Sequence, residues 1–188
     1  MLVQQTRWEN VKKAYNNLKA ACLNKFAAIK ESDLDSIKNC IKPVGMYSEK
    51  SRKLKELADV VIKAGGWENF INRDTKDVRA ELLRLNGIGY ETTDSILLFA
   101  SNKLTFPASR LVARVLERTG FKVPKSYEAF RKFIESELPG DLFSYKLFYA
   151  SSLVTVKIAC HSLNPDCLRC PISDTCYTSE YKQASKAP

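Results

Sequence analysis

Four cysteines lie close together near the end of the chain and could hold a metal. They have the spacing C-x6-C-x2-C-x5-C and are Cys160, Cys167, Cys170 and Cys176. Four thiolates at such short separations suit one metal centre, either zinc or a [4Fe-4S] cluster. The spacing alone does not separate these two. A pair of disulfides is the least favoured interpretation, because a reducing compartment keeps thiols free.

The other thiols and the single histidine call for simpler interpretations. Cys22 and Cys40 stand alone within helical patterns, so we predict that both are buried as small hydrophobic residues. His161 directly follows a predicted ligand. Because four cysteines already complete a ligand set, we expect His161 to be exposed and not to bind the metal.

A short loop with two glycines is the second feature that suggests chemistry. It reads Leu85-Asn86-Gly87-Ile88-Gly89 and lies between two amphipathic helical patterns. Glycine permits positive φ and lets a bulky partner approach the backbone. The amides of Ile88, Gly89 and Tyr90 would then begin a helix, where unpaired N–H groups favour an anion such as a phosphate of nucleic acid. A plain corner between two helices remains an equal alternative, because short glycine motifs are weak evidence.

Composition favours a globular protein with an anionic partner. The chain has 188 residues, of which 45% are hydrophobic and 27% charged. Its 30 Lys and Arg against 21 Asp and Glu give a formal charge of +9, which favours a polyanion. No apolar run approaches the roughly 18 residues of a membrane span. The first residues lack the layout of a signal peptide, so we expect an intracellular protein of the cytoplasm or nucleoid.

The hydrophobic periodicity predicts an all-α fold. Apolar residues recur at helical spacing along the chain, and no convincing strand pattern appears. We expect a first helix over residues 2–22 and later helices that start at Ser48, around Pro107, at Ser126 and after Asp141. The best boundary lies at residues 101–103, which divides the chain into domains 1–103 and 104–188.

Four segments together resemble the helix-hairpin-helix DNA glycosylases of the endonuclease III type. They are LNGIGYETTDSILLFA, IKPVGMYSEKSRKLKELA, LVQQTRWENV and the four-cysteine tail. The first is most similar to the branch that includes 3-methyladenine glycosylases. The resemblance implies a six-helix barrel domain with the hairpin, a second helical domain with a [4Fe-4S] cluster, and a DNA cleft. It therefore favours iron and sulfur over zinc. It also implies a monomer that binds double-stranded DNA containing a damaged or mismatched base.

The residues implied in DNA binding match the family. Gly87, Ile88 and Gly89 correspond to the hairpin that holds a DNA phosphate, with Tyr90 next to it. Gln4 or Gln5 falls where the family places a side chain in the gap left by a flipped nucleotide. Flipping is needed because the glycosidic bond cannot be attacked inside the base stack.

The residues implied in catalysis differ from the family. Glu91 occupies the position of the lysine that forms a Schiff base in bifunctional members, and a carboxylate cannot do this. Ser109 occupies the position of the aspartate that stabilises positive charge on the sugar, and we interpret it as a helix N-cap. Glu91 and Asp94 are the carboxylates that could replace the aspartate, although both would more often lie on a solvated helix face.

The leading hypothesis is a monofunctional DNA glycosylase for base-excision repair, with Ser109, Glu91 and Asp94 as catalytic candidates. The alternative is a catalytically silent DNA-binding protein of the same fold, which the changes at Glu91 and Ser109 favour. An electron-transfer protein that uses the cluster alone is least favoured, because it explains neither the hairpin nor the positive charge.

Overall fold

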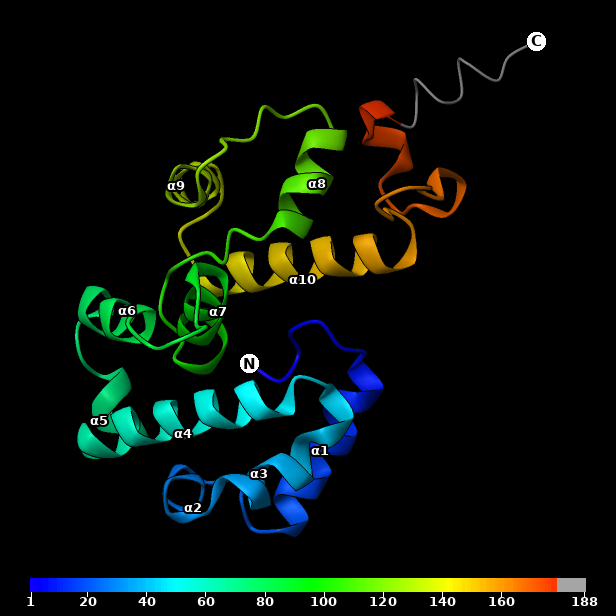
Figure 1. Cartoon of the computed structure of the whole chain (residues 1–188). Helices are drawn as coiled ribbons and strands as arrows, with labels where there is room; N and C mark the ends of the chain where they lie inside the picture. The colour runs from blue at the N-terminus through cyan, green and yellow to red at the C-terminus, as the bar shows by residue number, and fades with distance from the viewer. Residues whose placement is uncertain (179–188) are drawn as a thin grey trace. The chain divides into compact units, whose positions relative to one another are not determined.

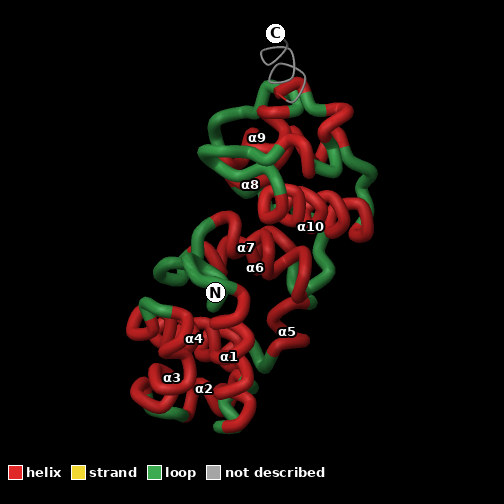
Figure 2. Tube along the Cα trace, turned by 90° about the vertical axis from the view of Figure 1, so that its right-hand side faces the viewer, coloured by secondary structure: helices red, strands yellow, loops and turns green. Residues whose placement is uncertain are grey.

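The computed structural model describes residues 1–178, and every regular element in that range is a helix. Figure 2 shows the helices joined by loops, with no strand in the described range. The predicted all-α fold is confirmed. The chain divides into two compact units, Met1–Thr93 and Asp94–Pro188. This division falls earlier than the boundary expected at residues 101–103, and the predicted domain limits stay a prediction.

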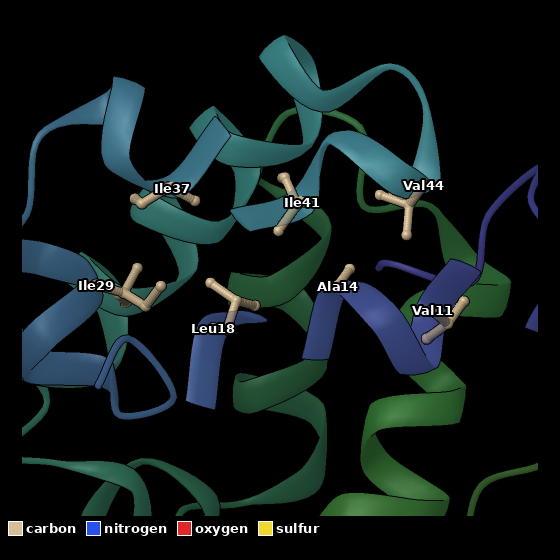
Figure 3. Close-up of a cluster of buried hydrophobic side chains, with 8 residues drawn as sticks. Val11, Ala14, Leu18, Ile29, Ile37, Ile41 and Val44 are labelled. Carbon is tan, nitrogen blue, oxygen red and sulfur yellow. The ribbon is translucent and has the colours of Figure 1, made fainter. Parts of the chain in front are cut away.

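The first unit is built on a core to which α1, α2, α3 and α4 contribute buried residues. Val11, Ala14 and Leu18 follow one another at spacings of three and four residues on α1, so they share one buried face. Ile37 and Ile41 of α3 pack against this face (Figure 3). The helices of the unit (Figure 1) are α1 (Trp8–Ala20), α2 (Phe26–Glu31), α3 (Leu34–Ile41), α4 (Tyr47–Lys63), α5 (Trp67–Ile71), α6 (Thr75–Leu83) and α7 (Tyr90–Ser95), which runs into the second unit.

Several predicted helix limits in this unit are wrong. The first helix begins at Trp8, so residues 2–5 form turns ahead of it. Helix α4 begins one residue before Ser48, because Met46 takes the left-handed conformation at its N-cap with φ of 45°. The short helix α2 was not predicted.

The prediction for Cys22 is also wrong, since this residue is exposed. Its φ of 58° places it in the left-handed conformation just after α1. Its amide donates to Lys19 O, and the next amide donates to Leu18 O. These bonds end the helix in the way that a glycine usually does, and the thiol points out of the core. Cys40 is half-buried, and burial raises the pKa of its thiol.

The second unit is built around one aromatic side chain. Phe106 is fully buried, and the rings of Tyr145, Phe148 and Tyr149 lie within 6.0 Å of its centroid. All three rings come from one long helix, so the loop that carries Phe106 is fixed against it. The helical elements of the unit (Figure 1) are a π-helical segment (Ile96–Ala100), α8 (Arg110–Arg118), α9 (Tyr127–Glu137), α10 (Leu142–Ile158) and two 3-10 turns (Cys167–Arg169 and Ser173–Thr175).

Helix starts in this unit follow the sequence well. Ser126 and Asp141 are N-caps, as predicted: each side chain accepts a hydrogen bond from the amide three residues on. Pro107 lies before α8 and not inside it, because Ser109 is the N-cap. Among residues 1–178 no helix is long and apolar enough to cross a membrane.

Candidate nucleic-acid interface and cysteine site

The two-glycine loop joins α6 to α7 as a helical hairpin. Gly87 has φ of 71°, the left-handed conformation that glycine tolerates best. The side chain of Ile88 is buried, and its amide donates to Leu85 O at 3.1 Å, which anchors the loop from inside. The amides of Gly87 and Gly89 donate to no acceptor within residues 1–178. The loop therefore presents two backbone donors. The prediction that the amide of Ile88 is available to an anion is wrong, because Leu85 O accepts it.

A lysine from α4 lies across this loop. A Cβ built on Gly87 would overlap the Cε and Nζ atoms of Lys53. Lys53 is half-buried and makes no hydrogen bond or ion pair with the described residues. At Gly89, by contrast, a Cβ would meet nothing within 4 Å. A large anion can therefore approach the hairpin at Gly89, with one ammonium group beside it.

The start of α7 continues this exposed surface. Tyr90 is exposed, and the guanidinium of Arg79 lies 5.5 Å from its ring centroid. A cation at that distance from an aromatic face is attracted to it, so Tyr90 is held against α6. Glu91 is also exposed and follows directly in the first turn.

The two glutamines near the N-terminus have different surroundings. The side chain of Gln4 is half-buried, and its Nε2 donates to Thr92 Oγ1 at 2.8 Å. Gln5 is exposed and has φ of 51°, which is uncommon for a residue with a Cβ. Gln4 thus ties the segment to α7, while Gln5 displays its side chain to solvent.

Ser109 is the N-cap of α8. Its Oγ accepts the amide of Val112 at 3.2 Å, and the residue is 1% exposed. The N-cap interpretation is confirmed. A hydroxyl group carries no charge at neutral pH, and this one is buried, so Ser109 has neither the charge nor the access that a catalytic carboxylate would have.

Asp94 lies inside the second unit and not on a solvated helix face. It is 0% exposed, and its carboxylate accepts hydrogen bonds from Tyr127 OH at 2.8 Å and Thr105 Oγ1 at 3.3 Å. The same Tyr127 oxygen accepts the amide of Ala108 at 3.2 Å. Asp94 therefore helps to fix the loop that leads to Ser109. Of the three catalytic candidates, only Glu91 is exposed.

The four predicted ligands line one cavity in the second unit. Cys160, Cys167, Cys170 and Cys176 all line this cavity, which is partly open to solvent. Arg118, at the end of α8, donates to Cys160 Sγ at 3.2 Å and to His161 O at 2.7 Å. The carbonyl of Arg118 accepts from Cys176 Sγ at 3.3 Å. One residue thus contacts both the first and the last cysteine. His161 is exposed, as predicted.

The thiols influence one another electrostatically. Burial raises the pKa of Cys170, and the neighbouring Cys160, Cys176 and Cys167 raise it further. Four thiolates around one cavity would repel each other, so the site favours a cationic group that takes up their charge. No three His, Cys, Asp or Glu residues in the described chain converge on a single ion. Four cysteine thiols that line one cavity are a donor set that fits an iron-sulfur cluster, which four cysteine thiolates hold.

Two contributors to these regions were missed from the sequence. Lys50 is buried and bonds to the N-terminal segment. It shares the inward face of α4 with Leu54, Leu57 and Val61. Its position on this apolar face could have predicted from the sequence that it is buried. The contacts of Arg118 could not be predicted from the local sequence, because its partners lie more than forty positions away.

Comparison with known proteins agrees with this arrangement. Residues 1–139 match the HhH-GPD superfamily base excision DNA repair protein family. The chain belongs to this family. The predicted resemblance to helix-hairpin-helix DNA glycosylases is thereby confirmed.

The similarity to individual family members extends over most of the chain. A protein of Methanocaldococcus jannaschii, whose name assigns it to the DNA repair glycosylases, is 36% identical over 94% of this chain and 81% of its own length. Endonuclease III of Thermotoga maritima is 26% identical over 94% of this chain and 78% of its own length.

Solved structures share the fold of the whole HhH-GPD chain. A thermostable thymine-DNA glycosylase has a TM-score of 0.75 at 25% identity, covering 96% of this chain and 81% of its own. An endonuclease III in a non-covalent complex with DNA has a TM-score of 0.78 at 20% identity, covering 97% and 82%.

Proposed function

We propose that this HhH-GPD protein is a monofunctional DNA glycosylase that removes a damaged or mismatched base from double-stranded DNA. The observation that carries the proposal is the hairpin, with two unpaired amides at Gly87 and Gly89 and the ammonium of Lys53 beside them. Backbone amides and cations are the groups that hold a DNA phosphate and set the register of a protein on the duplex. The formal charge of +9 favours the same partner.

Base release requires the nucleotide to leave the stack, and we assign the filling of the resulting gap to Gln5. Its exposed side chain is free to enter a duplex, whereas that of Gln4 is bonded to Thr92. An amide side chain can also hydrogen-bond to the base that remains. This assignment chooses one of the two glutamines that the sequence left open.

The proposed chemistry is hydrolysis. The N-glycosidic bond breaks, the base departs and takes up a proton, and the oxygen of water joins C1′ of the sugar. Glu91 has no amine and cannot form a Schiff base, so no imine between protein and sugar is expected at this position. As the exposed carboxylate of the three candidates, Glu91 would stabilise the positive charge that develops on the sugar.

We further propose that Cys160, Cys167, Cys170 and Cys176 hold a [4Fe-4S] cluster. The shared cavity, the mutual influence of the thiols and the guanidinium of Arg118 support this choice. The cluster would cross-link the end of α10, which Cys160 follows, to the loops that carry the other three cysteines, so its contribution here is structural.

A second candidate function is supported by one specific observation. Ser109 is buried and neutral at the position where the family resemblance implies an aspartate. A protein with that change would still bind and distort DNA while releasing no base. This silent binder differs from the leading proposal in one measurable quantity, the rate of base release.

Single-turnover base release tests the proposal. Duplexes that carry uracil, hypoxanthine, thymine opposite guanine, oxidised pyrimidines or methylated purines are incubated with excess protein, and alkali then cleaves any abasic sites. The proposal predicts release from at least one duplex, with strand breaks only after alkali and no adduct trapped by borohydride. Tight binding with no release on any duplex would favour the silent binder. A trapped adduct would contradict the monofunctional assignment.

A further inference from the structure

Lys50 has an environment that is costly for a cation. It is 1% exposed and lies in the first turn of α4, where the helix dipole disfavours positive charge. Burial lowers its pKa, and the nearby ammonium of Lys53 lowers it further. No carboxylate within residues 1–178 pairs with it. An apolar side chain of similar length would fill this space at lower cost, so packing alone does not account for a lysine.

The ammonium group of Lys50 donates hydrogen bonds to three backbone carbonyls. Nζ donates to Gln4 O at 2.8 Å, to Val44 O at 2.9 Å and to Leu2 O at 3.4 Å. An ammonium group has three donors, and here two of them hold the non-helical segment 2–5 while the third holds the turn before α4. The Gln4 side chain adds a fourth tie, to Thr92 of α7. The segment is thus attached at one end to α4 and at the other to the hairpin.

The residue that follows these ties has a strained backbone. Gln5 has φ of 51° and an exposed side chain. A residue with a Cβ keeps this conformation only when its surroundings impose it. The bonds from Lys50 to Gln4 and Leu2, together with the bond from Gln4 to Thr92, hold the chain directly before Gln5.

We propose that Lys50 is a positioning residue that presents Gln5 to DNA. It acts through the carbonyls of the 2–5 segment, so it sets the place and direction of the Gln5 side chain without touching the duplex. This inference rests on the role of Gln5 under the proposed function. It adds that the ability to open the base stack depends on a buried lysine in α4.

The test uses a duplex with 2-aminopurine beside a stable abasic-site analogue, at saturating protein. 2-Aminopurine fluorescence rises when the base unstacks. Gln5→Ala and Lys50→Met should each lower the rise about threefold, and the double variant should lower it no further, as expected for two residues that act as one unit. Hydrogen exchange of the free protein should show faster exchange at residues 2–6 in Lys50→Met.

Lys55→Met is the matched control, because Lys55 is another lysine of α4 that donates to a backbone carbonyl, that of Ser32. It should leave both the fluorescence and the exchange of residues 2–6 unchanged. If Lys50→Met does not fold, Thr92→Val removes only the acceptor of the Gln4 side chain and should lower the fluorescence rise in the same direction. A normal rise in Lys50→Met or Thr92→Val, with a reduced rise in Gln5→Ala, overturns the inference. An unchanged rise in Gln5→Ala overturns the role of Gln5 and the inference with it.

Discussion

The polar groups of the hairpin in the first unit and those before α8 in the second unit differ in burial and in hydrogen bonding. At the hairpin, the amides of Gly87 and Gly89 are unpaired and Lys53 has no partner in the described chain. Before α8, Asp94 and Ser109 are buried and hydrogen-bonded. Unpaired donors at a surface are available to a ligand, whereas satisfied buried groups stabilise the fold.

The residues that the family resemblance implies in DNA binding and those that it implies in catalysis therefore have different surroundings. The groups that we propose to hold a phosphate, the amides of Gly87 and Gly89, donate to no acceptor within residues 1–178, which is consistent with DNA binding. Ser109, which the resemblance predicts at the position of the family aspartate, is buried and caps a helix. Binding and catalysis therefore need different residues to be tested, and the accessible carboxylate is Glu91 in the hairpin.

The largest effect is expected at the cysteine cavity of the second unit. Cys167→Ser should bleach a brown protein, remove its bound iron and lower the free energy of unfolding by about 3 kcal/mol or more, because the free energy of metal binding is part of that of folding. Iron analysis and denaturant unfolding measure this. Cys22→Ser is the control, since Cys22 is exposed and belongs to the other unit. A colourless wild type that contains zinc would reject the cluster.

A smaller effect on stability is expected at Asp94. Asp94→Asn replaces a carboxylate that accepts two hydrogen bonds with a group that presents a donor, and the loss should be about 2 kcal/mol. Tyr127→Phe removes one of the same bonds and should cost less. Chemical denaturation measures both. A loss of base release in Asp94→Asn without any loss of stability would mean that Asp94 acts in catalysis.

A substitution in the hairpin should weaken DNA binding and leave stability unchanged. At Gly89 a Cβ meets no protein atom within 4 Å and φ is not positive, so Gly89→Ala should leave stability unchanged. The added methyl group should hinder the approach of a phosphate and weaken duplex binding about tenfold, the loss of one charge-assisted hydrogen bond. Gly140→Ala, at another glycine without close neighbours, is the control. Equal affinities in a fluorescence anisotropy titration would contradict phosphate binding at the hairpin.

The smallest effect is expected at an aspartate N-cap, a feature that occurs in both units. Asp33 caps α3 and Asp141 caps α10, and in each case bonds from the serine three residues on lower the pKa of the carboxyl group. A lowered folded-state pKa gives stability that is present above the unfolded value, about 3.9, and is lost as pH falls through the folded value. Asn can cap without titrating, so Asp141→Asn should flatten part of the acid limb of a stability curve. An unchanged acid limb would show that this cap makes no such contribution.

The sequence predicted those features that depend on neighbours along the chain. Ser126 and Asp141 start helices because an oxygen three residues before an amide is a local signal. Gly87 turns the hairpin for an equally local reason, since glycine tolerates its positive φ. These positions were predicted correctly, as was the helical fold.

Features that depend on distant partners could not be predicted in this way. The burial of Asp94 is set by Tyr127, thirty-three positions away, and that of Lys50 by carbonyls up to forty-eight positions away. The predicted burial of Cys22 was wrong because a helix can end on a left-handed residue other than glycine. Local patterns therefore predicted the turn of the hairpin, but not that Leu85 O accepts the Ile88 amide, and they predicted the surroundings of Asp94 wrongly.

The most direct test of this account compares single-turnover base release by Glu91→Gln and Ser109→Ala on the duplex that the wild type processes best. Gln keeps the size of Glu91 and removes its charge, so we predict a loss of about a hundredfold, as for removal of one electrostatic contact to a transition state. Ser109→Ala removes the N-cap and should cost about 1 kcal/mol of stability with base release nearly unchanged. Normal release by Glu91→Gln together with a large loss in Ser109→Ala would contradict the assignment of catalysis to the hairpin.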